Sequence, residues 1–196
     1  MKRLVVATRN LNKVREVRSV LAPLQDWELR EQPDTVPEIE ETGATFTDNA
    51  ILKAVHTSRF VDDFVLADDS GLCVDALDKR PGMFSNRYAA DDSQRIQQVL
   101  REMESIPDPQ RGAAFVCALA LARHGEVVWS GEGRVEGSIN RQPRGTNGFG
   151  YDLIFHIPEL ARTMAELTAE QKNEISHRDR ALRELCKMLV TWLERS

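Results

Sequence analysis

The feature that most constrains the fold is a series of short apolar runs that alternate with segments of helical periodicity. Residues 4–7 and 64–67 have the length and composition of buried strands. Between them, apolar residues recur at helical spacing over residues 14–24, and Thr45 with Asp48 matches the capping box that begins a second helix. Strands that alternate with helices in this way are typical of an α/β domain whose helices cover a central sheet.

The remainder of the chain continues this pattern with more strands. A helix is predicted over residues 93–104, and turn residues separate four further strands, predicted at residues 114–122, 127–129, 134–139 and 151–157. A last helix has an apolar face that consists of Ala181, Leu182, Leu185, Leu189, Trp192 and Leu193. The sequence therefore predicts a single α/β domain over residues 1–196, built around a mixed central sheet.

Composition limits the number of cores and the kinds of partner. With 196 residues, of which 41% are hydrophobic, the chain is long enough to bury one core and too short to require two. The formal net charge of -5 argues against a nucleic-acid-binding protein, because such proteins neutralise phosphates with many cations.

The first apolar run ends at Thr8, too short for a signal peptide or a membrane span. The three cysteines include no CxxC pair, so no zinc site or disulfide framework is predicted. We expect a cytoplasmic protein with no nucleic-acid or membrane partner.

The first candidate site is the loop between the first predicted strand and the first predicted helix. Backbone N–H groups at a helix start and the helix dipole favour an anion there, and Lys13 adds a full positive charge. A triphosphate suits such a position. The alternative is a polar loop in which Asn12 caps the helix. The residues of this loop are Thr8, Arg9, Asn10, Leu11, Asn12 and Lys13.

The second candidate site is the pair Asp68 and Asp69, at the predicted end of a buried strand. Ligands of open α/β sheets gather at the carboxyl ends of strands, and adjacent carboxylates there suit Mg2+, which prefers oxygen ligands. One of the two is also a candidate general base toward water. The alternative is a turn in which an Asp side chain caps the strand end. Glu38, Glu40 and Glu41 are either further site carboxylates or a solvated acidic face.

Two further clusters lie in the C-terminal part of the chain. Residues 145–152 place three glycines around Phe149; glycines let a ligand approach the backbone, and an aromatic ring stacks on a base. Just before the last predicted helix, Lys172, His177 and Arg178 offer donors to carbonyl and phosphate oxygens. The alternatives are a flexible turn whose Phe149 belongs to the core, and a solvated helix start with a structural His177.

The order and the amino-acid sequences of these segments resemble those of the inosine triphosphate pyrophosphatase family, also described as the XTP/dITP diphosphatases. The resemblance extends over nearly the whole chain, and several separate motifs in the same order make it specific. The matching strings are AT.N..K at residues 7–13, EETG.TF..NA..KA at 40–54, ADDSGL at 67–72, PG.FS.RY at 81–88, G..GFGYD at 145–152 and AELT..QK..ISHR at 165–178.

This resemblance implies an elongated, two-lobed α/β fold with a cleft, usually a homodimer, and Mg2+-dependent cleavage of nucleoside triphosphates to monophosphate and pyrophosphate. The implied substrates are non-standard purine nucleotides, namely ITP, dITP and XTP. Asp69 would be the proton acceptor and, with Glu40 and also Asp68, a metal ligand. The implied substrate-binding residues are Thr8, Arg9, Asn10, Leu11, Asn12, Lys13, Lys53, Ser70, Phe149, Gly150, Tyr151, Asp152, Lys172, His177 and Arg178.

Some positions depart from the pattern of the resembled family. Arg9 stands where members often have glycine, which puts the geometry of the phosphate loop in question, and Asp48, Asn147 and Asp179 replace other common residues. Selectivity is expected from donors aimed at the purine 6-oxygen, since adenine carries an amino group there. A mismatch of this kind lowers kcat/KM by a factor of roughly 10^4. Two other functions stay open: a pyrophosphatase for pyrimidine or modified nucleotides, and a non-catalytic nucleotide- or RNA-binding module.

Overall fold

The computed structural model describes residues 2–193 and confirms the predicted α/β class. Its strands are β1 (Lys2–Val6), β2 (Trp27–Glu31), β3 (Phe64–Val74), β4 (Gly112–Arg123), β5 (Glu126–Ile139), β6 (Phe155–Ile157) and β7 (Arg162–Thr163). Its α-helices are α1 (Leu11–Leu21), α2 (Phe46–Thr57), α3 (Asp92–Glu102), α4 (Ala169–Ile175) and α5 (His177–Leu193). None of the helices in the described range is long and apolar enough to cross a membrane.

The sheet is mixed, as predicted. Over the described residues, seven strands follow one another in the order β2-β1-β3-β4-β5-β6-β7. β1 pairs in parallel with both β2 and β3, whereas β6 pairs antiparallel with both β5 and β7. The chain divides into two compact units: unit 1 comprises the described residues of Met1–Asp69, Cys117–Gly133 and His177–Ser196, and unit 2 comprises Ser70–Val116 and Arg134–Ser176.

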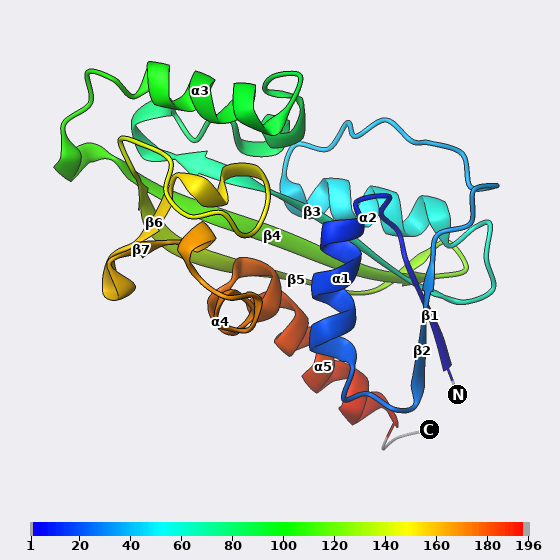
Figure 1. Ribbon diagram of the computed structural model, residues 1–196. Helices are drawn as coiled ribbons and strands as arrows, with labels where there is room; N and C mark the ends of the chain where they lie inside the picture. Colours follow the sequence, from blue (N-terminus) through cyan, green and yellow to red (C-terminus); the bar gives the residue numbers. More distant parts are fainter. Residues whose placement is uncertain (1, 194–196) are drawn as a thin grey trace. The chain divides into compact units, whose positions relative to one another are not determined.

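In unit 1, helices cover both faces of the strands. Val14 and Val17 of α1 pack with Leu182 and Leu185 of α5 in a cluster that also contains the side chain of Leu66 in β3. These two helices lie side by side (Figure 1). On the opposite face, α2 buries its alanines against alternate residues of the same strands, including Val5, Val65 and Ala67. Strands covered on both faces read as continuous apolar runs, which is why residues 4–7 and 64–67 were recognisable.

Unit 2 has a core of its own beneath α3. Ile96 and Val99 of α3 belong to one buried cluster with Leu72 of β3 and Phe155 of β6. The rings of Phe115 and Phe155 lie with their centroids 4.3 Å apart. Each unit thus buries a separate set of apolar side chains. The side chains of Trp192 and Leu193, predicted on the apolar face of the last helix, lie outside the described ones.

Two strand boundaries were predicted wrongly, because tertiary contacts in the structure override the local turn signals. β3 does not end at Asp68 but continues to Val74, since partners inside unit 1 bind both carboxylates and allow the strand to run through them. The segments 127–129 and 134–139 form the single strand β5. A Cβ at Gly133 would lie 2.0 Å from the carbonyl oxygen of His177, so this glycine marks a close backbone approach rather than a turn.

Two other differences concern short elements. Residues 151–157 form a strand only from Phe155 onward, because Gly150–Leu153 is a 3-10 turn in which Asp152 accepts a hydrogen bond from the backbone N–H of Phe149. β2 was missed altogether. Its sequence, WELRE, has no apolar run, because at this edge of the sheet only Trp27 is buried.

Candidate active site

The loop of residues 8–13, the first candidate site, leads from β1 into α1, as the sequence predicted. Its cap is Asn10, whose side chain accepts hydrogen bonds from the backbone N–H groups of Asn12 and Lys13. The alternative in which Asn12 caps the helix is therefore wrong. The backbone N–H of Asn10 in turn donates to Thr8 Oγ1, at 3.1 Å. The outer side of the loop is tied by an exposed ion pair of Arg9 with Glu38.

Asp68 is enclosed by cations in unit 1. Its Oδ1 accepts from Lys13 Nζ at 3.0 Å, and its Oδ2 accepts from Arg178 Nε and Nη2 at 3.2 and 3.1 Å. Arg178, whose exposed fraction is 1%, also forms an ion pair with Glu16 of α1. Burial by itself raises the pKa of Asp68, but the charges of Lys13 and Arg178 outweigh it and hold the pKa well below its usual range.

Asp69 has different partners because successive residues of a strand point to opposite faces. Its Oδ2 accepts from Asn49 Nδ2 at 3.0 Å, and its Oδ1 lies 3.3 Å from Lys53 Nζ. Asn49 and Lys53 are one helical turn apart on α2, so a single helix face supplies both contacts. Burial raises the pKa of Asp69, and the nearby Lys53 charge and the Asn49 hydrogen bond offset this only in part.

The structure connects a different glutamate to Asp69 than the sequence suggested. Lys53 Nζ donates to Glu41 Oε1 at 2.7 Å as well as to Asp69, whereas Glu40 is exposed. Asn49 Oδ1 accepts from the backbone N–H of Gly43 at 2.8 Å, which fixes the segment that carries both glutamates. In the described part of the chain, no three His, Cys, Asp or Glu side chains gather in a group that holds a metal by itself.

A second group of predicted residues lies in unit 2. Lys172 Nζ donates to Asp152 Oδ2 at 2.6 Å and lies 4.5 Å from the centroid of the Phe149 ring. Asp152 Oδ2 also accepts from the backbone N–H of Phe149, at 2.9 Å. One carboxylate therefore binds both the ammonium group of Lys172 and the backbone of Phe149. A Cβ at Gly148 would lie 2.1 Å from that same oxygen, and the φ of this residue is 78°, so the turn requires glycine.

The cluster predicted before the last helix is divided between the two units. Lys172 belongs to unit 2, whereas His177 and Arg178 begin α5 and are buried in unit 1. In unit 2, Tyr151 is buried and its hydroxyl donates to the carbonyl oxygen of Ser85, while Ser70 is half-buried in β3.

Two residues at these contacts, Glu16 and Asn49, were given no role from the sequence, and Glu41 was considered only as one of three candidate carboxylates. Glu41 and Asn49 stand inside the matching string at residues 40–54, but the sequence did not show which residues they contact.

The environment of Asp68 predicts a loss of stability in acid. A carboxyl group whose pKa is lowered by folding stabilises the folded state above its unfolded pKa, about 3.9, and this contribution is lost as the pH falls through the lower folded value. We expect the free energy of unfolding to decrease steadily below about pH 4. Urea unfolding of the wild type and of Asp68→Asn over a pH series measures this, because the variant should show a shallower acid dependence. Asp62→Asn, at an exposed position, is the control and should retain the wild-type slope.

Comparison with known proteins identifies the family of the chain. The sequence profile of the Ham1 family matches residues 4–188. The dITP/XTP pyrophosphatase of Halalkalibacterium halodurans is 47% identical over 96% of this chain and 100% of the relative, and that of Bacillus subtilis is 46% identical over 96% and 98%. The solved structure of a HAM1 protein from Coxiella burnetii has a TM-score of 0.89 and 44% identity, and the match covers 97% of this chain and 100% of that one. The resemblance found in the ordered motifs is thus confirmed, and the chain belongs to the Ham1 family.

Proposed function

We propose that this chain hydrolyses ITP, dITP and XTP to the monophosphate and inorganic pyrophosphate, and so removes non-standard purine nucleotides from the nucleotide pool. The names of its relatives from Halalkalibacterium halodurans and Bacillus subtilis, dITP/XTP pyrophosphatases, support this activity. The observation that carries the proposal is the buried Asp69 carboxylate, which α2 orients through Asn49 and Lys53. An oriented and desolvated carboxylate is suited to accept a proton from an attacking water.

The two adjacent aspartates divide the work between them. Asp69 accepts the proton of the water that attacks the α-phosphorus, and its raised pKa makes it a stronger base than a solvated carboxylate. Asp68 is a positioning residue, because both of its oxygens already bind cations and it holds Lys13 at the start of α1. Lys13 and Lys53 supply the positive charge that a polyphosphate requires.

The donor set near Asp69 fits Mg2+. This ion is usually held by one or two carboxylates together with substrate phosphates and water, and Asp69 with Glu40 or Glu41 provides such carboxylates. Asp68 fits less well, since two cationic side chains bind its oxygens. When bound, Mg2+ supplies charge neutralisation on the polyphosphate and on the departing pyrophosphate.

The base is read in unit 2 by the group around Asp152. Phe149 offers a ring for stacking, and the Lys172 ammonium group, which Asp152 holds near that ring, is a donor for the keto oxygen of hypoxanthine or xanthine. Adenine carries an amino group at this position and leaves the donor without an acceptor. Arg178 is occupied by Asp68 and Glu16, which favours Lys172 as the discriminating cation.

Lys172→Ala tests this assignment. One charge-assisted hydrogen bond contributes about 1.5 to 3 kcal/mol, so the ratio of kcat/KM for ITP to that for ATP should shrink by about 10-fold to 100-fold. Steady-state kinetics on both nucleotides measures the ratio. Lys187→Ala, at an exposed residue of α5 that pairs with Glu184, is the matched control and should leave the ratio unchanged. An unchanged ratio in Lys172→Ala would mean that other groups read the base.

The function itself is tested by product analysis. Incubation with ITP, dITP, XTP, GTP and ATP, and with the pyrimidine nucleotides CTP and UTP, in the presence and absence of Mg2+ should give IMP and pyrophosphate from ITP, with little turnover of ATP. Steady appearance of IDP and orthophosphate would exclude a pyrophosphohydrolase. Turnover confined to pyrimidine nucleotides would favour the related pyrophosphatases, and nucleotide binding without turnover would favour a binding module.

We take the chain to be a single-domain, cytoplasmic homodimer whose partner is a small nucleotide rather than nucleic acid or a membrane. The net charge of -5 supports the exclusion of nucleic acid. Light scattering of the purified protein tests the dimer.

A further inference from the structure

Arg111 of unit 2 is a buried cation whose side-chain hydrogen bonds, within the described chain, all go to backbone carbonyl groups. Its exposed fraction is 3%, and its guanidinium donates to the backbone carbonyl oxygens of Ile139, Met103, Ile106 and Asn140. Among the described residues, no carboxylate forms an ion pair with it. The charge of nearby Asp108 also acts on Arg111 but forms no ion pair with it, so a buried guanidinium bound mainly by carbonyl dipoles retains a positive potential at the surface nearest to it.

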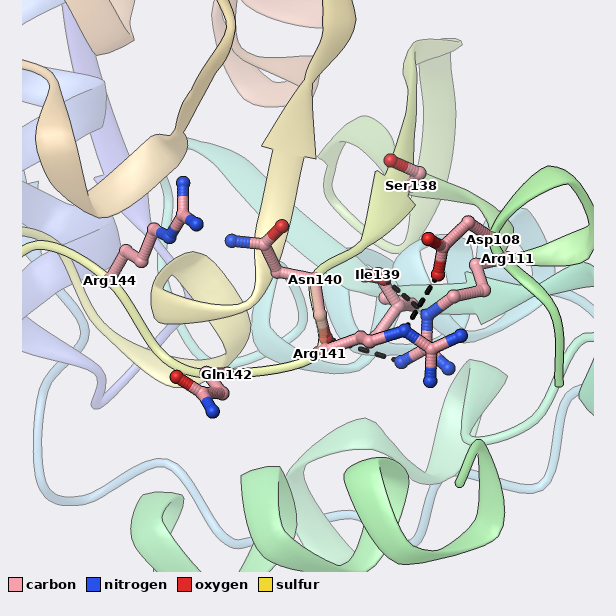
Figure 2. A pocket seen from close by; sticks show the side chains of 8 residues that line it. All are labelled: Asp108, Arg111, Ser138, Ile139, Asn140, Arg141, Gln142 and Arg144. Atoms are coloured by element: carbon pink, nitrogen blue, oxygen red, sulfur yellow. Dashed lines mark hydrogen bonds and ion pairs between the residues drawn. The ribbon is translucent and has the colours of Figure 1, made fainter. Parts of the chain in front are cut away.

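A second arginine lies directly beside it. Arg141 Nη2 donates to the carbonyl oxygen of Ile106 at 3.3 Å, and Arg111 Nη1 donates to the same oxygen at 3.4 Å. Figure 2 shows the two side chains together, with Asp108 bound to Arg141 Nε at 2.7 Å. The charge of Arg141 contributes, after burial, to lowering the pKa of Arg111, which reflects repulsion between the two guanidinium groups. One carboxylate therefore stands against two adjacent cations.

These residues line a hollow of about 290 Å3. Arg144 lies on the same loop and adds a third cation; within the described chain its guanidinium makes no hydrogen bond or ion pair (Figure 2). Asn140, Gln142 and Ser138 supply neutral polar groups to the lining. Three arginines, one aspartate and several polar groups around a hollow of this size form a surface for an anion larger than a single ion.

We propose that this hollow, which we call the arginine hollow, binds a phosphate-bearing anion. The guanidinium fork matches the geometry of phosphate oxygens and binds them in pairs, which a lysine cannot do. The Nη1 group of Arg141 is engaged by no described residue and is open to such an oxygen. An anion here also relieves the repulsion between Arg111 and Arg141. The phosphate comes either from free pyrophosphate or from a nucleoside monophosphate, and the volume admits both.

Calorimetric titration of the full chain tests the proposal, with pyrophosphate and IMP as separate probes. The variant is Arg141→Ala with Arg144→Ala, because both side chains are exposed and Arg111, which holds four carbonyls, is left intact. The matched control is Arg134→Ala, an exposed arginine of the same unit that pairs with Glu136. Since the proposed active site also takes these anions, the wild type should bind one probe molecule more than the double variant. Any residual binding at the hollow should be at least about 10-fold weaker.

The outcomes are distinct. Loss of the additional site for pyrophosphate identifies the free anion as the ligand, and loss for IMP identifies the nucleotide phosphate; either supports the proposal, provided that Arg134→Ala retains the site. Equal stoichiometry and affinity of the wild type and the double variant for both probes overturn it. ITP turnover of the double variant should remain at the wild-type level. A wild type that fails to cleave ITP would refute the proposed function and leave the comparison of binding valid.

Discussion

In Asp69→Asn, turnover of ITP should fall by a factor of about 10^2 or more while the chain remains folded. The amide keeps the shape of the side chain, but it can neither accept a proton from water nor contribute charge to a metal site. Stability should not suffer near neutral pH. A carboxyl whose pKa is raised by folding destabilises the folded state once the pH exceeds its folded pKa, and the amide removes that cost. Single-turnover kinetics and urea unfolding of the same preparation measure the two effects.

Asp68→Asn is the matched control, because it makes the same chemical change at the neighbouring residue on the opposite face of β3. Its main effect should be on stability, since Lys13 and Arg178 lose their shared carboxylate. If Asp69→Asn keeps near-normal turnover with Mg2+ present, Asp69 is not the base and Asp68 becomes the candidate. If both variants lose turnover and both are fully stable, the division of roles between the two aspartates is wrong.

The secondary structure was predictable where local chemistry alone determines it. The capping box of Thr45 and Asp48 begins α2 in the structure, and the apolar runs at residues 4–7 and 64–67 are strands covered by helices on both faces. Predictions failed where a tertiary partner overrides the local signal. The sequence around Asp68 predicts the end of a strand. In the structure, Lys13 and Arg178, which are 55 and 110 residues away along the chain, bind this carboxylate, and the strand continues. No pattern within one segment carries that information.

The candidate site was also predictable only where the sequence itself carries the information. Motif order predicted the family, and residue types predicted that carboxylates and lysines take part. The sequence did not show that Asn49 and Lys53 of α2 contact Asp69, whereas side chains of α1 and α5 contact Asp68. These contacts depend on the alternation of side chains along β3. It also did not distinguish Glu40 from Glu41, since two adjacent glutamates in an irregular segment have no periodicity to tell their directions apart.

Arg178→Ala should be strongly destabilising, with a loss of about 3 to 5 kcal/mol in the free energy of unfolding. The guanidinium is buried between Asp68 and Glu16, and removal of one partner from a buried charge network leaves the others poorly compensated. Because Arg178 is assigned to Asp68 and Glu16 rather than to the base, kcat/KM should fall in similar proportion for ITP and for ATP. Arg178→Lys should recover little, since an ammonium group cannot bind two carboxylates as a planar fork does.

The sequence suggested another role for Arg178, as a donor to the purine, and the two roles predict different results. A reader of the base would shrink the ITP to ATP ratio by about 10-fold to 100-fold at nearly unchanged stability. An organiser of Asp68 would lower stability and leave the ratio constant. The double variant Arg178→Ala with Glu16→Gln separates them further, because the amide removes one of the two carboxylates that the arginine compensated. Urea unfolding should then show part of the lost stability restored, whereas a contact with the base would gain nothing from a change at Glu16.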